Sequence, residues 1–422
     1  MPPRVDRRRK PRCNRLRVPA LTVVKARFQS LDVLRGLAEL TVVFLHYLLI
    51  FPTFDNLYGA RAGEFWILKW TPLKLLYAGH EAVIFFFVLS GFVLALPYFG
   101  AAARPALLGF WAKRLARIYP ALWFALGLAW IATGTLHTSR HPEFGTTFKI
   151  FWNHFPGPAE VVANLAVVTP FDFVKYDPVV WTLTHEVRLS LIFPLIVMLI
   201  ARGQGKRLVA WGCAAAFIVS FFADGVQSLQ MTFFYSTLFV FGALLAKNRD
   251  RAVAFTAALP NWKRWSALVG ALCLYTSRWW LFPTFALIHL QPIGDWEVGI
   301  AALVLISLAI GWPAMDSVLR VRPLVLLGRM SYSLYLLHAV VLLGAISLLY
   351  PRLPIWAVMS LSLPATLLIS YGSYLWIERP TIKFGHWAAG RLVVGVGAPR
   401  PSEGGLRLAP AAASAPAFPS SR

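Results

Sequence analysis

Cysteine and charged residues are both scarce in this 422-residue sequence. The three cysteines, Cys13, Cys213 and Cys273, have a spacing that fits neither a disulfide framework nor a metal site, so no metal is predicted. Only 14% of the residues are charged, whereas 58% are hydrophobic. So little polar side chain cannot cover a water-soluble globule of this size. The composition therefore predicts an integral membrane protein.

The apolar residues gather in about ten runs, each close to the roughly 20 residues that a helix needs to cross the hydrocarbon core. We predict an all-α protein of ten transmembrane helices, centred on 37–51, 83–96, 118–136, 183–200, 209–223, 231–246, 265–282, 298–312, 332–349 and 356–377. Residues 28–384 form the membrane domain in this interpretation. The basic head, 1–27, and the Pro- and Ala-rich tail, 385–422, are predicted to be disordered.

Acidic residues are scarcer than basic ones: the sequence has 18 aspartates and glutamates against 41 lysines and arginines. When the N-terminus is placed in the cytoplasm, most of the basic residues fall in the head, the tail and the loops on the same side. The positive-inside rule therefore predicts a multi-pass membrane protein with both termini cytoplasmic. The long loop 137–177 then lies outside and is expected to cap a site. The same rule accounts for the net charge of +23, so no nucleic-acid partner is predicted.

The first apolar run carries four ionisable residues, Asp32, Arg35, Glu39 and His46. At about 100° per residue, all four fall within about 60° of Arg35 and form one polar stripe on the helix. A charge at the bilayer centre costs at least about 2.5 kcal/mol, so such residues persist mainly where they line a site or a pathway. The stripe therefore predicts chemistry or transport inside the membrane.

Two further motifs lie in the next two runs. Ser90 and Gly91 form a small spot among bulky aromatic residues, which by itself is more typical of helix packing than of catalysis. Arg114 and Arg117 share one helix face at the cytoplasmic end of their run. Two guanidinium groups there can clamp phosphates or can simply anchor the helix in the membrane, and their spacing alone favours neither interpretation.

Later runs also carry polar groups. Glu186 lies beside a histidine and an arginine, where it can serve a site or form a structural ion pair. Ser331, Tyr335 and His338 fall within roughly 60° of one another on a single helix. They are as consistent with a hydrogen-bonded packing contact as with substrate binding.

Together, the order and spacing of these motifs resemble the acyltransferase-3 family of multi-pass membrane O-acyltransferases. The resemblance extends over about 28–384. The matching elements are Arg35 and His46 with ten residues between them, the Phe85–Phe92 segment with its Ser-Gly pair, Arg114-x-x-Arg117, the run from Gly328 to His338, and Glu378-Arg379-Pro380. The segment around Glu186 departs from the family pattern because the usual aromatic pair after it is replaced by Leu189 and Ser190.

The resemblance implies transfer of a short acyl group, commonly acetyl from acetyl-CoA, to a hydroxyl of a cell-envelope polysaccharide, a glycolipid or a secondary metabolite. Acyl-CoA is then a donor substrate, and no permanently bound cofactor is expected. His46 acts as general base or transient acyl carrier. The residues assigned on this basis are His46 and Glu186 for catalysis, Arg35, Arg114 and Arg117 for acyl-CoA, and Glu39, Ser90, Tyr335 and His338 for the acceptor substrate.

A different class of protein also uses intramembrane polar stripes. A transporter or channel would carry a solute or protons along the line of ionisable residues from Asp32 to His338. The enzyme is favoured because a basic phosphate-clamp candidate lies beside the stripe, and because no inverted repeats with paired broken helices are evident. The identity of the acceptor, the acyl chain length and the oligomeric state are left open by the sequence.

Overall fold

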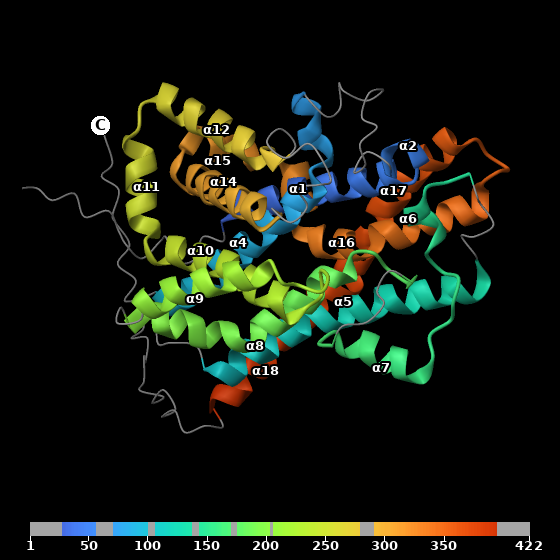
Figure 1. The fold of residues 1–422 in the computed structure, drawn as a ribbon, viewed down its shortest axis with the longest axis horizontal. Helices are drawn as coiled ribbons and strands as arrows, with labels where there is room; N and C mark the ends of the chain where they lie inside the picture. Colours follow the sequence, from blue (N-terminus) through green and yellow to red (C-terminus); the bar gives the residue numbers. More distant parts are fainter. Residues whose placement is uncertain are drawn as a thin grey trace, which may run out of the picture.

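A computed structural model describes residues 28–55, 71–99, 106–136, 143–169, 175–202, 206–278 and 291–394 of the protein (Figure 1). The predicted head, 1–27, lies outside these ranges. Every regular element within them is helical, which confirms the all-α prediction. Helices α11, α12, α14 and α15 gather at one side of the bundle in Figure 1, while the site described below lies among α1, α4, α5, α8 and α16.

The elements differ widely in length. They are α1 (Gln29–Leu49), α2 (Pro52–Asp55), η2 (Pro72–Tyr77), α4 (Gly79–Phe99), α5 (Leu107–Thr135), α6 (Thr146–Lys149), α7 (Pro158–Ala166), α8 (Val180–Arg202), α9 (Lys206–Ser220), α10 (Leu229–Lys247), α11 (Arg249–Ala258), α12 (Asn261–Tyr275), α14 (Gln291–Gly311), α15 (Pro313–Leu319), α16 (Arg322–Leu349), α17 (Ile355–Ser373), η6 (Tyr374–Glu378) and α18 (Arg379–Val394).

Seven helices in the described residues are long and apolar enough to cross a membrane: α4, α5, α8, α10, α14, α16 and the continuous stretch Ile355–Leu392. The sequence predicts ten spans, and the three remaining runs form α1, α9 and α12. Helix α1 has 21 residues but carries three charged side chains, whereas α9 and α12 have 15 residues each. These three helices are therefore too polar or too short to count as candidate spans by length and composition alone.

The last span continues past the predicted end of the membrane domain. A π-helical turn, η6, joins α17 to α18, and α18 runs on to Val394. The sequence-based boundary at residue 384 therefore falls inside a helix, while 395–422 lie outside the described residues. Within η6, the Glu378 carboxylate is buried and accepts a 2.8 Å hydrogen bond from the hydroxyl of Ser333 on α16.

The backbones of α1 and α16 touch at a pair of glycines. A β-carbon added at Gly36 would lie 2.7 Å from the backbone nitrogen of Gly328, and one added at Gly328 would collide with the carbonyl oxygen of Asp32. Helices α4 and α10 meet in the same way through Gly91, whose added β-carbon would collide with the carbonyl of Phe239. Gly91 thus serves helix packing, as the sequence suggests for its motif.

The contact at Gly36 sets the register of α1 against α16. Glu39 and His46 are seven residues apart, so they lie on one face of α1, two turns from each other. Ser331, Tyr335 and His338 follow Gly328 along α16 and share a face for the same reason. The close approach therefore turns the polar stripe of α1 toward the polar face of α16.

Candidate active site

A cavity of about 110 Å³ lies among α1, α4, α5, α8 and α16, and we call it the arginine cavity. Its wall combines aromatic and aliphatic side chains with polar groups from all five helices. The polar lining residues are Arg35, Glu39, Ser90, Arg114, Arg117, Thr182, Glu186, Ser331, Tyr332 and Tyr335. All of the predicted site residues except the two histidines therefore reach one cavity, although they come from distant parts of the sequence.

The three arginines of the cavity differ in their partners. Arg114 forms an ion pair with Glu186 and donates a 3.1 Å hydrogen bond from Nε to the hydroxyl of Ser190. The guanidinium of Arg35 lies 3.5 Å from the carboxylate of Asp32, which is one turn earlier on α1. Arg117 makes no hydrogen bond or ion pair with any residue that the structure describes. The guanidinium of Arg117 is therefore the one most available to an anionic ligand.

Glu186 does not lie where a catalytic partner of His46 would be. Its carboxylate pairs with Arg114, and it makes no hydrogen bond with either site histidine among the described residues. This contact is the ion pair that the sequence left open as one of two interpretations, and the catalytic role of Glu186 stays a prediction. Ser190, one of the two residues that replace the family's usual aromatic pair, therefore takes part in fixing Arg114.

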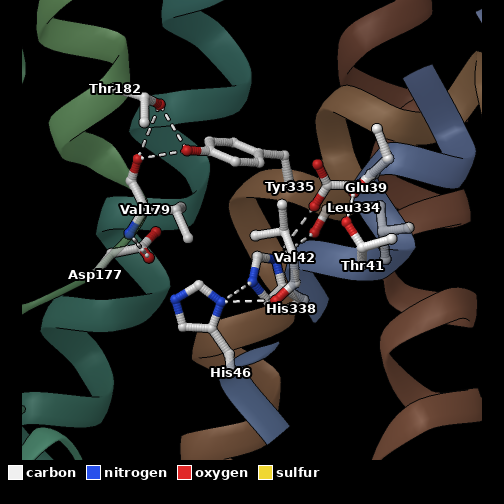
Figure 2. Close-up of polar contacts among 11 residues, drawn as sticks. Glu39, Thr41, Val42, His46, Asp177, Val179, Thr182, Leu334, Tyr335 and His338 are labelled. Atoms are coloured by element: carbon white, nitrogen blue, oxygen red, sulfur yellow. Dashed lines mark hydrogen bonds and ion pairs between the residues drawn. The ribbon is translucent and has the colours of Figure 1, made fainter. Parts of the chain in front are cut away.

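The fully buried His338 and the half-buried His46 form a pair (Figure 2). His338 Nε2 lies 3.1 Å from His46 Nδ1, and the two ring centroids are 4.9 Å apart. The carboxylate of Glu39 lies 3.6 Å from His338 Nδ1. Glu39, which lines the arginine cavity, therefore lies beside the hydrogen-bonded pair of His338 and His46.

The hydrogen bonds of the two rings assign their tautomers. His46 Nδ1 lies 2.9 Å from the carbonyl oxygen of Val42, and His338 Nδ1 lies 3.0 Å from that of Leu334. A carbonyl oxygen can only accept, so both Nδ1 atoms carry a proton when the rings are neutral. His338 Nε2 then accepts from His46 Nδ1. His46 Nε2 keeps its lone pair, which is the state that a general base requires.

His46 also lines a second, smaller space, which we call the histidine cavity. Its other walls are apolar and come from the ends of α1 and α16 and from the loop before α8. They are Leu49, Ile50, Phe148, Phe151, Pro178, Ala339, Leu342 and Leu343. The loop 137–177, expected from the sequence to cap a site, thus contributes Phe148 and Phe151 from its described part.

Tyr335 stands between the two cavities. Its ring lines the arginine cavity, and its hydroxyl donates a 2.9 Å hydrogen bond to the carbonyl oxygen of Val179. The hydroxyl of Thr182 lies 2.6 Å from the same tyrosine oxygen. Val179 follows Pro178, which lines the histidine cavity. Tyr335 is therefore held by the chain segment that separates the two spaces.

Asp177 is a buried carboxyl group to which the sequence analysis assigns no role. Its carboxyl group is fully buried in the turn before α8, and Oδ1 accepts a 3.3 Å hydrogen bond from the Val179 amide. Oδ2 has no hydrogen-bond partner within the described residues. Burial raises the pKa of Asp177 from 3.8 to about 8, against the opposing effect of the Val179 amide. The adjacent Pro178 would have been its only sequence signal, since no spacing rule links Asp177 to the helices.

His185 and Arg188, the ionisable neighbours of Glu186 in the sequence, point away from the arginine cavity. His185 Nε2 lies 2.6 Å from the carbonyl oxygen of Val226, and its Nδ1 lies 2.9 Å from the hydroxyl of Thr232. Arg188 donates to the same hydroxyl at 2.9 Å and to the carbonyl of Gln227 at 2.7 Å. Both side chains thus tie α8 to the start of α10, and neither lines the arginine cavity.

The raised pKa of Asp177 predicts how stability changes with pH. Because the folded protein holds this proton up to about pH 8 while the unfolded chain releases it near pH 4, the group lowers stability as pH rises through that window. Asp177→Asn should therefore raise the apparent melting temperature in detergent at pH 8, by the equivalent of a few kcal/mol at most, and much less at pH 5. Asp250→Asn, which removes an exposed carboxylate on α11, is the control. An equal gain at both pH values would contradict the prediction.

Comparison with known proteins gives one match. The family model Acyl_transf_3, described as an acyltransferase domain, matches residues 28–375. No curated protein and no solved structure matches the chain. The matched region includes the arginine cavity, the histidine pair and the histidine cavity. The chain therefore belongs to the Acyl_transf_3 family and is a multi-pass membrane acyltransferase that transfers acyl groups other than aminoacyl groups.

Proposed function

We propose that the protein transfers a short acyl group, acetyl in the simplest case, from acyl-CoA to a hydroxyl of a cell-envelope carbohydrate, glycolipid or secondary metabolite. The observation that carries the proposal is the half-buried His46, whose Nδ1 is bonded to His338, a residue that lies beside Glu39 of a cavity lined by three arginines. A base next to a cationic cavity suits a reaction in which a phosphate-bearing donor meets a neutral alcohol.

The donor is assigned to the arginine cavity. The phosphates of CoA suit the guanidinium groups of Arg35 and Arg117, which are only partly buried. An enclosed volume of about 110 Å³ is far smaller than CoA, so the nucleotide would lie at the mouth and the thioester end inside. This size also favours a short acyl chain.

The acceptor is assigned to the side of the histidine cavity. The hydroxyl gives its proton to His46 Nε2 while its oxygen attacks the thioester carbonyl carbon. The carbon–sulfur bond then breaks and CoA leaves as the thiolate. His338 steadies the imidazolium that forms on His46 by accepting from its Nδ1, and Glu39 lies behind His338, 3.6 Å from His338 Nδ1.

The topology proposed with this function has both termini in the cytoplasm and ten spans, in which α1, α9 and α12 cross together with the seven candidate helices. Arg35 precedes His46 by 11 residues, or about 16 Å along α1, so the donor would bind nearer the cytoplasm than the acceptor. A bacterial cell membrane is the proposed location.

Cysteine labelling tests this topology. In a background with the three native cysteines replaced by serine, His154→Cys should react with a membrane-impermeant maleimide in intact cells, because His154 is exposed in the proposed outer loop. Ser402→Cys, in the tail, should react only after the cells are permeabilised. Labelling of the tail in intact cells would contradict the cytoplasmic C-terminus.

The donor assignment predicts a selective effect at Arg117. Arg117→Gln should raise the KM for acetyl-CoA by about tenfold or more, because a charge-assisted phosphate contact is lost, and should leave the KM for the acceptor unchanged. The measurement is thiol release in proteoliposomes. It should be repeated with acetyl-pantetheine, which lacks the nucleotide phosphates and should be used equally by the variant and the parent.

The matched control is Lys113→Gln, which removes a positive charge from the exposed face of the same helix. It should leave both KM values near those of the parent. Equal losses for Lys113→Gln and Arg117→Gln would assign both residues to membrane anchoring instead.

The base assignment predicts the effect of changing His46. His46→Gln should insert and bind acetyl-CoA normally but lose turnover by roughly 10² to 10⁴ if His46 is a general base, and by more if it carries the acyl group. His338→Gln should show a smaller loss, because it removes the partner of the base and not the base itself.

Binding and folding are checked by the shift in melting temperature on adding CoA. His154→Gln, which changes an exposed histidine, serves as the matched control and should keep full turnover. Near-normal turnover of His46→Gln would reduce the histidine pair to a packing contact and would overturn the proposed mechanism.

A further inference from the structure

The carboxyl group of Asp177 is buried, but the fold does not satisfy all of its hydrogen-bonding capacity. Its side chain has no solvent exposure, and only one of its two oxygens has a hydrogen-bond partner, the Val179 amide. Oδ2 is left without one. Leaving a buried polar atom unsatisfied costs roughly 1 to 3 kcal/mol, so a group retained in this state is expected to meet a ligand.

The unsatisfied oxygen lies on the reactive side of His46. In Figure 2 the ring nitrogen of His46 that does not face His338 points toward the side of the site where Asp177 lies. The two side chains make no direct hydrogen bond or ion pair among the described residues. Asp177 adjoins Pro178, which lines the histidine cavity together with His46. A small polar group is therefore needed to connect them.

The histidine cavity has the size for such a group. It encloses about 20 Å³, which is enough for one hydroxyl or one water molecule. All of its other lining side chains are apolar.

On the basis of the function proposed above, we infer that Asp177 is the acceptor-positioning residue: its Oδ2 hydrogen-bonds the oxygen of the acceptor hydroxyl and directs the hydrogen of that hydroxyl to His46 Nε2. The chemical class of ligand is thus a neutral hydroxyl group, held between an acid and a base.

The roles of the two groups are complementary. Below about pH 8 the carboxyl of Asp177 keeps its proton, since burial raises its pKa to that value, and Oδ2 donates to the acceptor oxygen. His46 takes the acceptor's proton as the new carbon–oxygen bond forms and the carbon–sulfur bond breaks. CoA departs as the thiolate, and Asp177 retains its own proton throughout.

Ionisation of Asp177 would reverse the interaction. A carboxylate can only accept, so above about pH 8 it would face the acceptor oxygen without a hydrogen to donate. The other titratable groups around it are His46 on α1, His338 and Tyr335 on α16, and the Lys175 and Glu160 pair of the preceding loop. An amide at position 177 keeps a donor at every pH and leaves all of these groups in place.

The experiment compares Asp177→Asn, Asp177→Ala and the parent enzyme in proteoliposomes with acetyl-CoA. Thiol release is measured with water as the simplest hydroxyl acceptor and with methyl α-glucoside as a carbohydrate acceptor, between pH 7 and pH 9, after subtracting the rate of His46→Gln. Asp250→Ala, which removes an exposed carboxylate from α11, is the matched control.

Asp177→Ala should lower thiol release to either acceptor by about tenfold, the effect of one lost hydrogen bond, with the KM for acetyl-CoA unchanged. Asp177→Asn should stay near the parent rate at pH 7 and should not share the parent's fall above pH 8. Equal rates of Asp177→Ala and the parent, or a fall above pH 8 that persists in Asp177→Asn, would overturn the inference. A parent enzyme no faster than His46→Gln would instead overturn the proposed function on which it rests.

Discussion

The contact of α1 with α16 at Gly36 and Gly328 is the constraint on which the site depends. Because neither residue has a β-carbon, the two backbones approach more closely than side chains would otherwise permit. The register fixed there brings Glu39 and His46 of one helix onto His338 of the other. If the backbones were farther apart, the rings of His46 and His338 would lie too far from each other to form a hydrogen bond.

The polar groups of the bundle are satisfied in two different ways. On the arginine side, Arg114 is neutralised by Glu186 and held by Ser190, so the cavity keeps its shape while Arg117 stays available. On the histidine side, the Nδ1 atom of each ring lies against a backbone carbonyl of its own helix. This contact places the proton of each neutral ring on Nδ1. The contacts of Arg114 thus fix the wall of the arginine cavity, and the contacts of the histidines leave Nε2 of His46 unprotonated.

The sequence predicts the components of the site better than their partners. The period of the first helix reveals the stripe from Asp32 to His46, because a helical face is a local property. Partners on different helices depend on packing, so the sequence could not distinguish Glu186 as a partner of Arg114 from Glu186 as a partner of His46. The sequence does not indicate that Asp177 is buried, since this residue lies in a turn where no periodicity relates it to the helices.

The same distinction explains the outcome for the fold. Apolar length predicts helices well, and the all-helical architecture follows from it. It does not decide how far a helix continues at its ends, so α18 extends beyond the predicted domain boundary. The number of spans depends on short helices such as α9 and α12, whose 15 residues each fall below the length of a candidate span.

Tyr335 has a consequence for how the two cavities can open. Its hydroxyl is bonded to Thr182 and Val179, so α16 is joined to the segment where α8 begins. That segment lines the arginine cavity through Thr182 and follows Pro178 of the histidine cavity. A movement that separates α8 from α16 therefore has to break both hydrogen bonds, at a cost of roughly 0.5 to 1.5 kcal/mol each.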